Sequence, residues 1–277
     1  MCQLLGMNSH LPASLTVSFT GFTRRGGETD HHSDGWGVAF FESDSETPGK
    51  GVRHFVDKTS AVTSPIAHML KQYPIKSHNV VAHVRKATIG DVSLENCHPF
   101  VRELWGRYWV FAHNGDLRNF EPRLHGNFHP VGSTDSERAF CWLLQELNKS
   151  HVGVPSTDEL NCTLQELIPQ IASHGTLNFL LSNGQALWAH ASTQLCYLTR
   201  EFPFGEVHLK DAEMRIDMAE LNGRDDRLSL VVTEPLTTNE AWVQMARGEL
   251  ISFVDGRVQA QLQCDTSGYA KPTIPSP

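Results

Sequence analysis

Cys2 is the residue whose position most directly suggests covalent chemistry. The residue after Met1 is small, so removal of Met1 is expected, and Cys2 would then begin the mature chain. A terminal cysteine carries a thiol of pKa about 8.5 and an α-amine of pKa about 7.7–8.0, so nucleophile and general base come together on one residue. The structural alternative is a cysteine that merely starts a strand beside Leu4 and Leu5.

Asn114 and Gly115 end the apolar segment YWVFAHNG (108–115) and are candidates for an oxyanion hole. At such a strand end, an Asn side-chain amide and a Gly backbone N–H can point at one position and stabilise a tetrahedral oxyanion. The structural alternative is an ordinary Asn-Gly turn.

Two charged residues are candidates for holding a substrate. Arg85 stands near the end of the apolar segment 80–85, where a guanidinium could grip a carboxylate with two parallel hydrogen bonds. Asp135 stands at a predicted helix start, where the helix dipole favours a carboxylate, and it could bind an ammonium group. A surface arginine and a helix-capping aspartate are the structural alternatives.

The 15 histidines require a metal hydrolase to be considered. The chain has no HExxH motif, and the adjacent His31 and His32 cannot place both rings on one metal as easily as an i, i+4 helical pair. Cys97 and His98 are neighbours, but neighbours in an extended strand point to opposite faces, so they do not predict a catalytic dyad. We expect no catalytic metal and no cofactor.

The elements that must position these residues are mostly strands. Short apolar or alternating runs bounded by turn residues predict strands at 35–41, 80–85, 108–115, 178–182, 186–190, 228–233 and 249–254. Asn183-Gly184 and Asp255-Gly256 each separate two runs, and these dipeptides favour the turns of antiparallel hairpins.

Two helices are predicted. A capping-box sequence at Thr134–Glu137 precedes apolar residues at helical spacing, which predicts a helix to about Lys149. A similar signal at Ser156–Glu159 predicts a second helix that stops before Gly175, with a kink at Pro169.

This order of elements favours an α+β layered protein over a regular βαβ alternation. The length of 277 residues admits one large domain or two small ones. Composition does not change across the only plausible linker, 149–157, so we expect one domain over 1–264 and a loose tail over 265–277.

Composition and charge exclude several classes of function. Lys and Arg number 23 against 31 Asp and Glu, a net charge of −8 without long blocks of either sign, which argues against nucleic-acid or anionic-membrane binding. The longest apolar runs fall far below the ~18 residues of a membrane helix. The first residues do not resemble a secretory signal, and the six cysteines are scattered, so we expect a cytoplasmic protein with reduced thiols.

Six segments occur in an order that resembles the class II glutamine amidotransferases, which are N-terminal nucleophile hydrolases. They are MCQLLG, HHSDGWG, AHVRKAT, ENCHPF, AHNG and TDSE, spanning Cys2 to about Glu137. The later segment TEPLTTNEAW (233–242) fits the stand-alone, YafJ-like members.

The resemblance implies a four-layer αββα sandwich and hydrolysis of a γ-glutamyl amide through a thioester. Cys2 would be the nucleophile and its amine the base, and Asn114 with Gly115 would bind the oxyanion. Arg85 would bind the substrate α-carboxylate and Asp135 its α-ammonium group. Thr88 and His98 would line or support the pocket.

Two departures from the family pattern limit what the resemblance implies. Synthase-linked members often read RGxDSxG where this chain has His31–Gly37, HHSDGWG, which resembles stand-alone members that include hydrolases of glutathione-like or ergothioneine-pathway compounds. Only about 140 residues follow Glu137, so any ammonia acceptor would be a separate protein. We predict a glutamine or γ-glutamyl amide hydrolase; a γ-glutamyl peptide hydrolase and a glutamine-binding regulatory module without turnover are the alternatives.

Overall fold

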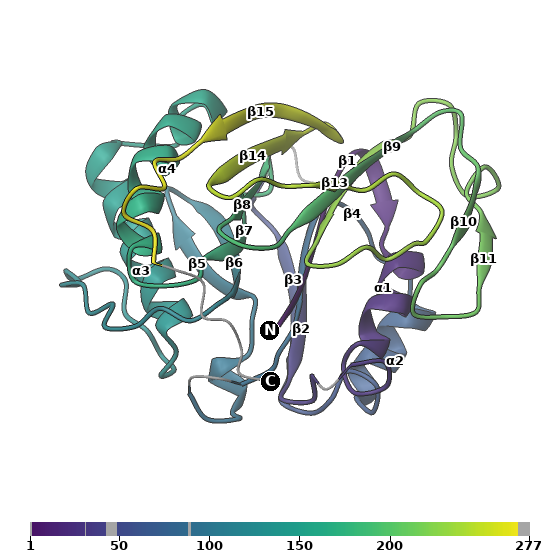
Figure 1. The fold of residues 1–277 in the computed structure, drawn as a ribbon, viewed down its shortest axis with the longest axis horizontal. Helices are drawn as coiled ribbons and strands as arrows, with labels where there is room; N and C mark the ends of the chain where they lie inside the picture. The colour runs from purple at the N-terminus through teal and green to yellow at the C-terminus, as the bar shows by residue number, and fades with distance from the viewer. Residues whose placement is uncertain (1, 31, 43–48, 88–89, 271–277) are drawn as a thin grey trace.

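The four layers of the molecule are visible in Figure 1. The computed structural model describes residues 2–30, 32–42, 49–87 and 90–270. Two antiparallel sheets face each other at the centre, and a pair of helices covers the outer face of each. The predicted α+β fold, an αββα sandwich in one domain, is confirmed.

The first sheet has seven strands, with β1 at its centre. In spatial order they are β13 (Val243–Gln244), β9 (Cys196–Glu201), β12 (Arg227–Val232), β1 (Gln3–Ser14), β4 (Lys76–Val84), β2 (Trp36–Phe41) and β3 (Val52–Asp57). Because β1 pairs with β12 on one side and β4 on the other, Cys2 lies at the end of a strand held from both sides.

The second sheet has six strands. In spatial order they are β15 (Arg257–Gln263), β14 (Glu249–Val254), β8 (Leu187–Ala191), β7 (Asn178–Ser182), β6 (Arg107–Asn114) and β5 (Phe100–Leu104). A separate hairpin of β10 (Glu206–His208) and β11 (Arg215–Asp217) follows β9 in the chain. Both predicted hairpins are confirmed, since β7 pairs with β8 and β14 pairs with β15 across the expected turns.

The helices divide between the two outer layers. α1 (Thr16–Arg24) and α2 (Pro65–Gln72) pack on the first sheet, while α3 (Asp135–Ser150) and α4 (Thr157–Ala172) pack on the second. A short 3₁₀ turn, η1 (Leu94–Asn96), precedes β5. The two predicted helices are α3 and α4, and α4 continues past Pro169 to Ala172.

Three apolar cores hold the layers together. Alternate residues of each strand face opposite sides, so Leu4 packs between the sheets while Leu5 packs under α1 and α2. Gly6 allows the sheets to come close, because a Cβ there would lie 2.9 Å from a methyl group of Leu187.

The first part of the predicted tail packs against the domain. Tyr269 is buried, its hydroxyl is 3.0 Å from Nε2 of His190, and the N–H of Ala270 donates to the carbonyl of Ala172. Residues 265–270 are therefore not a loose extension, and residues 271–277 lie outside the described part of the chain.

Candidate active site

The start of β1, the end of β4 and the end of β6 meet at one place. Gln3 pairs with Val84, so Cys2 lies next to the turn that begins at Arg85. The backbone nitrogen of Cys2 donates a 3.0 Å hydrogen bond to Oδ1 of Asn114, at the end of β6 in the other sheet. The fold thus brings together Cys2, Arg85 and Asn114, as the sequence predicts.

The thiol of Cys2 lies against the backbone of Lys86. Sγ is 3.3 Å from both the N–H and the carbonyl oxygen of Lys86, so the thiol can accept from one and donate to the other. Burial raises the pKa of the Cys2 thiol above its ordinary value, even though the residue keeps some exposed surface, and Arg85 only partly opposes this effect. A thiol in this setting needs a base to become a nucleophile.

Asn114 is held so that its amide donor remains free. Its Oδ1 accepts from Cys2, and its backbone carbonyl accepts from Nδ2 of Asn178 over 3.1 Å. Nδ2 of Asn114 is buried and has no hydrogen-bond partner among the described residues. A buried, unpaired donor beside a thiol is the arrangement that an oxyanion hole requires.

Gly115 continues from Asn114 at a point where no side chain fits. A Cβ at this position would lie 1.9 Å from the carbonyl oxygen of Thr176. The N–H of Gly115 makes no hydrogen bond to another residue in the described ranges, so it is a second free donor.

His113 fastens this strand end to its surroundings. Its Nε2 is 2.9 Å from the carbonyl oxygen of Thr176 and its Nδ1 is 2.8 Å from the hydroxyl of Ser136. The carbonyl can only accept, so Nε2 carries the proton and Nδ1 of the neutral ring accepts from Ser136. Burial lowers the pKa of His113, against the opposing charge of Asp135, which keeps the ring neutral.

Arg85 is buried where β4 ends. Its Nη1 and Nη2 donate to the carbonyls of Asp91 and Gly90, over 3.0 and 3.2 Å. These two hydrogen bonds orient the guanidinium group. The turn after Arg85 is fixed by Asp34, whose carboxylate accepts from the N–H of Ala87 over 2.8 Å.

Asp135 begins α3, as predicted. Its Oδ2 accepts from the N–H of Leu117 over 2.6 Å, which ties the helix start to the turn after Gly115. Thr134 caps the helix by accepting from the N–H of Glu137, as predicted, but the reciprocal half of the capping box is absent. The Glu137 side chain instead accepts from the N–H groups of Val131 and Gly132 and pairs with Arg102.

Comparison with known proteins identifies the family of the chain. The family model for class II glutamine amidotransferases matches residues 1–275. The chain belongs to the class II glutamine amidotransferase family.

Two relatives and one solved structure match this chain over most of their length. The "Putative glutamine amidotransferase" of Haemophilus influenzae is 47% identical, over 95% of this chain and 87% of that protein. The "Putative glutamine amidotransferase YafJ" of Escherichia coli is 44% identical, over 92% and 98%. A crystal structure described as a predicted glutamine amidotransferase from Pseudomonas aeruginosa is 40% identical, with a TM-score of 0.73, and covers 94% of this chain and all of that one.

Two further residues predicted for the site are His98 and Thr88. His98 is buried between the rings of His83 and Phe100, at centroid distances of 4.3 and 4.4 Å. Thr88 lies outside the described residues. The Cys97 Sγ lies 3.4 Å from the carbonyl oxygens of both Asp57 and Ser93, and either can accept the thiol hydrogen, so its contacts are structural.

Sequence reasoning did not single out the residues that hold the site. The backbone of Lys86 contacts Cys2, and Asn178 contacts Asn114. The N–H of Asp34 donates to the carbonyl of Arg85, and Ser136 contacts Asp135 and His113. Asp34 belongs to HHSDGWG, so the motif itself was the available signal. No group of three metal-ligating side chains occurs within the described residues, and none of their helices is long and apolar enough to cross a membrane.

Proposed function

We propose that this chain hydrolyses glutamine, or a related γ-glutamyl amide, through a thioester on Cys2. The observation that carries the proposal is the position of Asn114, which orients the Cys2 nitrogen with one side-chain atom and keeps a buried donor free on another. A site that only bound glutamine would need neither a nucleophile nor an unpaired oxyanion donor.

The base in this mechanism is the α-amine that Cys2 gains when Met1 is removed. With the Cys2 nitrogen held by Asn114, the amine takes the thiol proton, directly or through one water molecule. The raised pKa of the thiol makes this transfer necessary at neutral pH.

In the first half-reaction, Sγ of Cys2 attacks the γ-amide carbon and forms a C–S bond. The carbonyl oxygen becomes negative and accepts from Nδ2 of Asn114 and the N–H of Gly115. The amine returns its proton to the leaving nitrogen, the C–N bond breaks, and ammonia or an amine departs from the thioester.

In the second half-reaction, water replaces the departed amine. The α-amine of Cys2 accepts a proton from water as its oxygen attacks the thioester carbon, and the same two donors hold the second oxyanion. The C–S bond breaks, the sulfur recovers a proton, and the γ-carboxylate product leaves.

Two charged side chains orient the substrate in this proposal. Arg85 binds the α-carboxylate with its fork, and Asp135 binds the α-ammonium group, so a compound lacking either charge is rejected. Thr88 and His98 line or support the pocket. The amide leaving group has no assigned contact, so both free glutamine and γ-glutamyl peptides remain within the proposed substrate class.

The proposal places the reaction in the cytoplasm, with any acceptor of the released ammonia on a separate protein. This assignment rests on the scattered cysteines, which favour a compartment that keeps thiols reduced.

The experiment that tests the proposal uses untagged protein and a panel of glutamine and γ-glutamyl peptides. Glutamate and ammonia are measured in parallel, with Cys2→Ala as the control. Glutamate release that Cys2→Ala abolishes supports the proposal, and the preferred compound identifies the leaving group. Binding of glutamine without any release of glutamate would instead favour a regulatory module.

A further inference from the structure

A cavity lies beside β9, well away from Cys2. It holds about 480 Å³, which is within the range of ~300–1,000 Å³ typical of ligand sites. Arg200 lines this cavity. In the sheet, Arg200 of β9 is the pairing partner of Leu228 of β12, and Leu228 is in turn the partner of Ser9 of β1. Ser9 is seven residues beyond Cys2, or about 23 Å at about 3.3 Å per residue, so the cavity is not part of the catalytic site.

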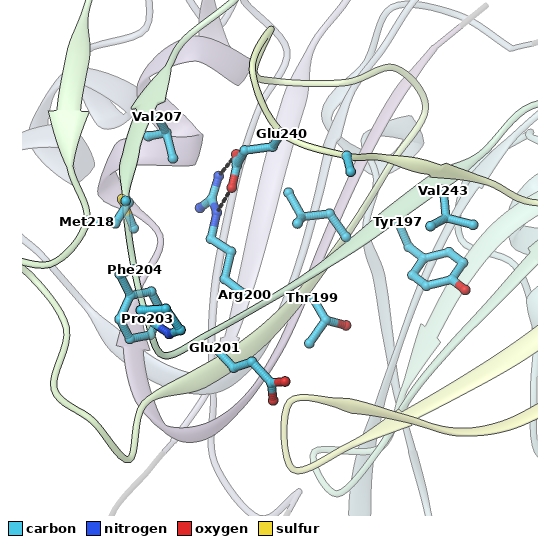
Figure 2. Close-up of a pocket in the computed structure, with 13 residues that line it drawn as sticks. Tyr197, Thr199, Arg200, Glu201, Pro203, Phe204, Val207, Met218, Glu240 and Val243 are labelled. Atoms are coloured by element: carbon cyan, nitrogen blue, oxygen red, sulfur yellow. Dashed lines mark hydrogen bonds and ion pairs between the residues drawn. The ribbon is translucent and has the colours of Figure 1, made fainter.

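The cavity follows an open sheet edge. β13 pairs with β9 only at Cys196 and Tyr197, and beyond Tyr197 no other described segment continues the ladder. Residues 240–243 diverge from β9 there, and Figure 2 shows the cavity-lining side chains of both segments. The cavity therefore lies between β9 and residues 240–243, where the two segments separate; we call this space the fork beside β9.

The alternation of hydrogen-bonding direction along β9 shows which residues direct their backbone N–H and C=O groups to this open edge. The N–H of Met245 donates to the carbonyl of Leu195, so Leu195 directs its backbone groups away from β12. Because the direction alternates along an antiparallel strand, Thr199 and Glu201 present their N–H and C=O groups to the open edge as well. Unpaired groups of this kind are a template for a further strand.

Arg200 adds a fixed donor to the same cavity. Its Nε and Nη2 bind the carboxylate of Glu240 over 2.7 and 2.6 Å (Figure 2). The hydroxyl of Thr237 also donates to Glu240. Nη1 of Arg200 makes no hydrogen bond to any other residue in the described part of the chain, while the residue is only 7% exposed. The neutralised ion pair favours a neutral acceptor, such as a peptide carbonyl, over an anion.

The remaining walls are largely apolar. Pro203, Phe204, Val207 and Met218 line one side, and Val243, 48% exposed, lines the other. An apolar side chain would fit between them, alternating along its chain with residues that face solvent.

We propose that this fork binds a short, extended, uncharged peptide segment of a partner protein by strand addition to β9. The segment pairs its backbone with Thr199 and Glu201, one of its carbonyls accepts from Nη1 of Arg200, and an apolar side chain packs against Phe204 and Met218. This mode of binding takes its affinity from backbone hydrogen bonds and its specificity from the side-chain pocket.

The test uses the isotope-labelled full-length chain and an acetylated, amidated pentapeptide of alternating threonine and valine. We expect the peptide, at millimolar concentration, to shift the amide resonances of Thr199 and Glu201 in NMR spectra and to slow their hydrogen exchange. The same peptide N-methylated at alternate amides should bind ~10-fold more weakly, because the pairing hydrogen bonds are lost.

Two variants test the assigned atoms. Thr199→Pro removes the N–H that faces the edge, and Ala241→Trp fills the fork from its opposite wall without touching the β9–β12 ladder. Each should weaken peptide binding ~10-fold while leaving glutamate release unchanged. Ala219→Trp, at an exposed position outside the lining, is the matched control and should bind the peptide normally.

Three outcomes would overturn the proposal. The first is the absence of shifts at Thr199 and Glu201, and the second is equal binding of the methylated peptide. The third is a concentration-dependent shift of these resonances without peptide, which would assign the edge to a second copy of the chain. If Thr199→Pro does not fold, Ala241→Trp and the methylated peptide decide.

Discussion

Oδ1 of Asn114 accepts a 3.0 Å hydrogen bond from the backbone nitrogen of Cys2 and thereby joins the end of β6 in one sheet to the start of β1 in the other. The two residues are 112 positions apart in the sequence. Nδ2 of the same Asn114 side chain is buried without a partner among the described residues. The Asn114 amide therefore holds the Cys2 nitrogen with Oδ1 and offers a donor with Nδ2, and different substitutions can separate these two roles.

Asn114→Ala should lower kcat by ~10²–10³-fold with a much smaller change in KM, because one preorganised oxyanion donor is lost. Asn114→Asp keeps an acceptor for the Cys2 nitrogen but places a negative charge where the oxyanion forms, so kcat should fall at least as far. Steady-state glutamate release measures both. An Asp variant with wild-type kcat would remove Asn114 from the oxyanion hole.

The strands flanking the site could be predicted because apolar runs and turn dipeptides mark them, and β7 and β14 match their predicted ranges. The central strand β1 was not predicted over its length. Its buried polar residues, such as Asn8 and Ser9, hide the apolar pattern, and they are satisfied by Asn79 and the carbonyl of Ser77, which only the folded sheet supplies.

The helices of the first outer layer were also missed, for a physical reason. α1 has no side-chain hydrogen bond at its N-cap, and its sequence contains Gly21 and several threonines, which are weak helix formers. Its stability comes from packing of Phe19 and Phe22 on the sheet.

The hydrogen bond from the N–H of Ala87 to Asp34 could not be predicted either. It joins residues 53 apart in the sequence, and a local pattern cannot show it.

Arg85→Lys should raise KM at least ~10-fold with a smaller loss of kcat, because a single ammonium cannot reproduce the two parallel hydrogen bonds of the fork. Asp135→Asn should act in the same direction by removing the charge opposite the α-ammonium group. Kinetics with glutamine and with an analogue lacking the α-amine tests this assignment. The wild type should prefer glutamine to this analogue, and Asp135→Asn should remove that preference. An undiminished preference for glutamine in Asp135→Asn would contradict the role of Asp135.

Gly115→Ala should abolish turnover and destabilise the fold, since its Cβ would lie 1.9 Å from the carbonyl oxygen of Thr176. That carbonyl also accepts from His113, so it cannot move without breaking a buried contact. Gly153→Ala is the matched control, because a Cβ there meets no atom within 4 Å. Thermal unfolding and glutamate release of the two variants should diverge; equal behaviour would show that the strand end is pliable.

A tag left in place ahead of Met1 should abolish activity, whereas a tag after Pro277 should not. The first converts the Cys2 amine into an amide that accepts no proton at neutral pH. In the C-terminally tagged enzyme, the rate should rise as pH rises through about 7.7–8.0, because the free amine must be deprotonated to act as base. Intact mass should show loss of Met1. Equal glutamate release from both proteins, with the N-terminal tag still attached, would exclude the terminal-amine mechanism.

His83 predicts how stability responds to acid. Burial lowers the pKa of His83 from 6.5 to about 3, and neither ring nitrogen has a partner among the described residues. Below about pH 6.5 the unfolded chain binds a proton that the folded chain does not, so acid favours unfolding through this residue. Near pH 5 the loss relative to pH 7 amounts to roughly 2 kcal/mol. His83→Phe should remove that part of the acid sensitivity, because an apolar ring needs no proton and leaves no buried nitrogen unpaired.

Urea unfolding of both proteins at pH 7 and near pH 5 measures the difference. The exposed His129→Phe is the control, since it removes a histidine without changing a buried one, and its loss of stability in acid should equal that of the wild type. His98, stacked 4.3 Å from His83, has its pKa lowered well below 6.5 by the same burial. Some acid sensitivity should therefore persist in His83→Phe and diminish further when His98 is also replaced. If His83→Phe lost stability in acid as steeply as the wild type, burial of a neutral His83 would not be what weakens the fold at low pH.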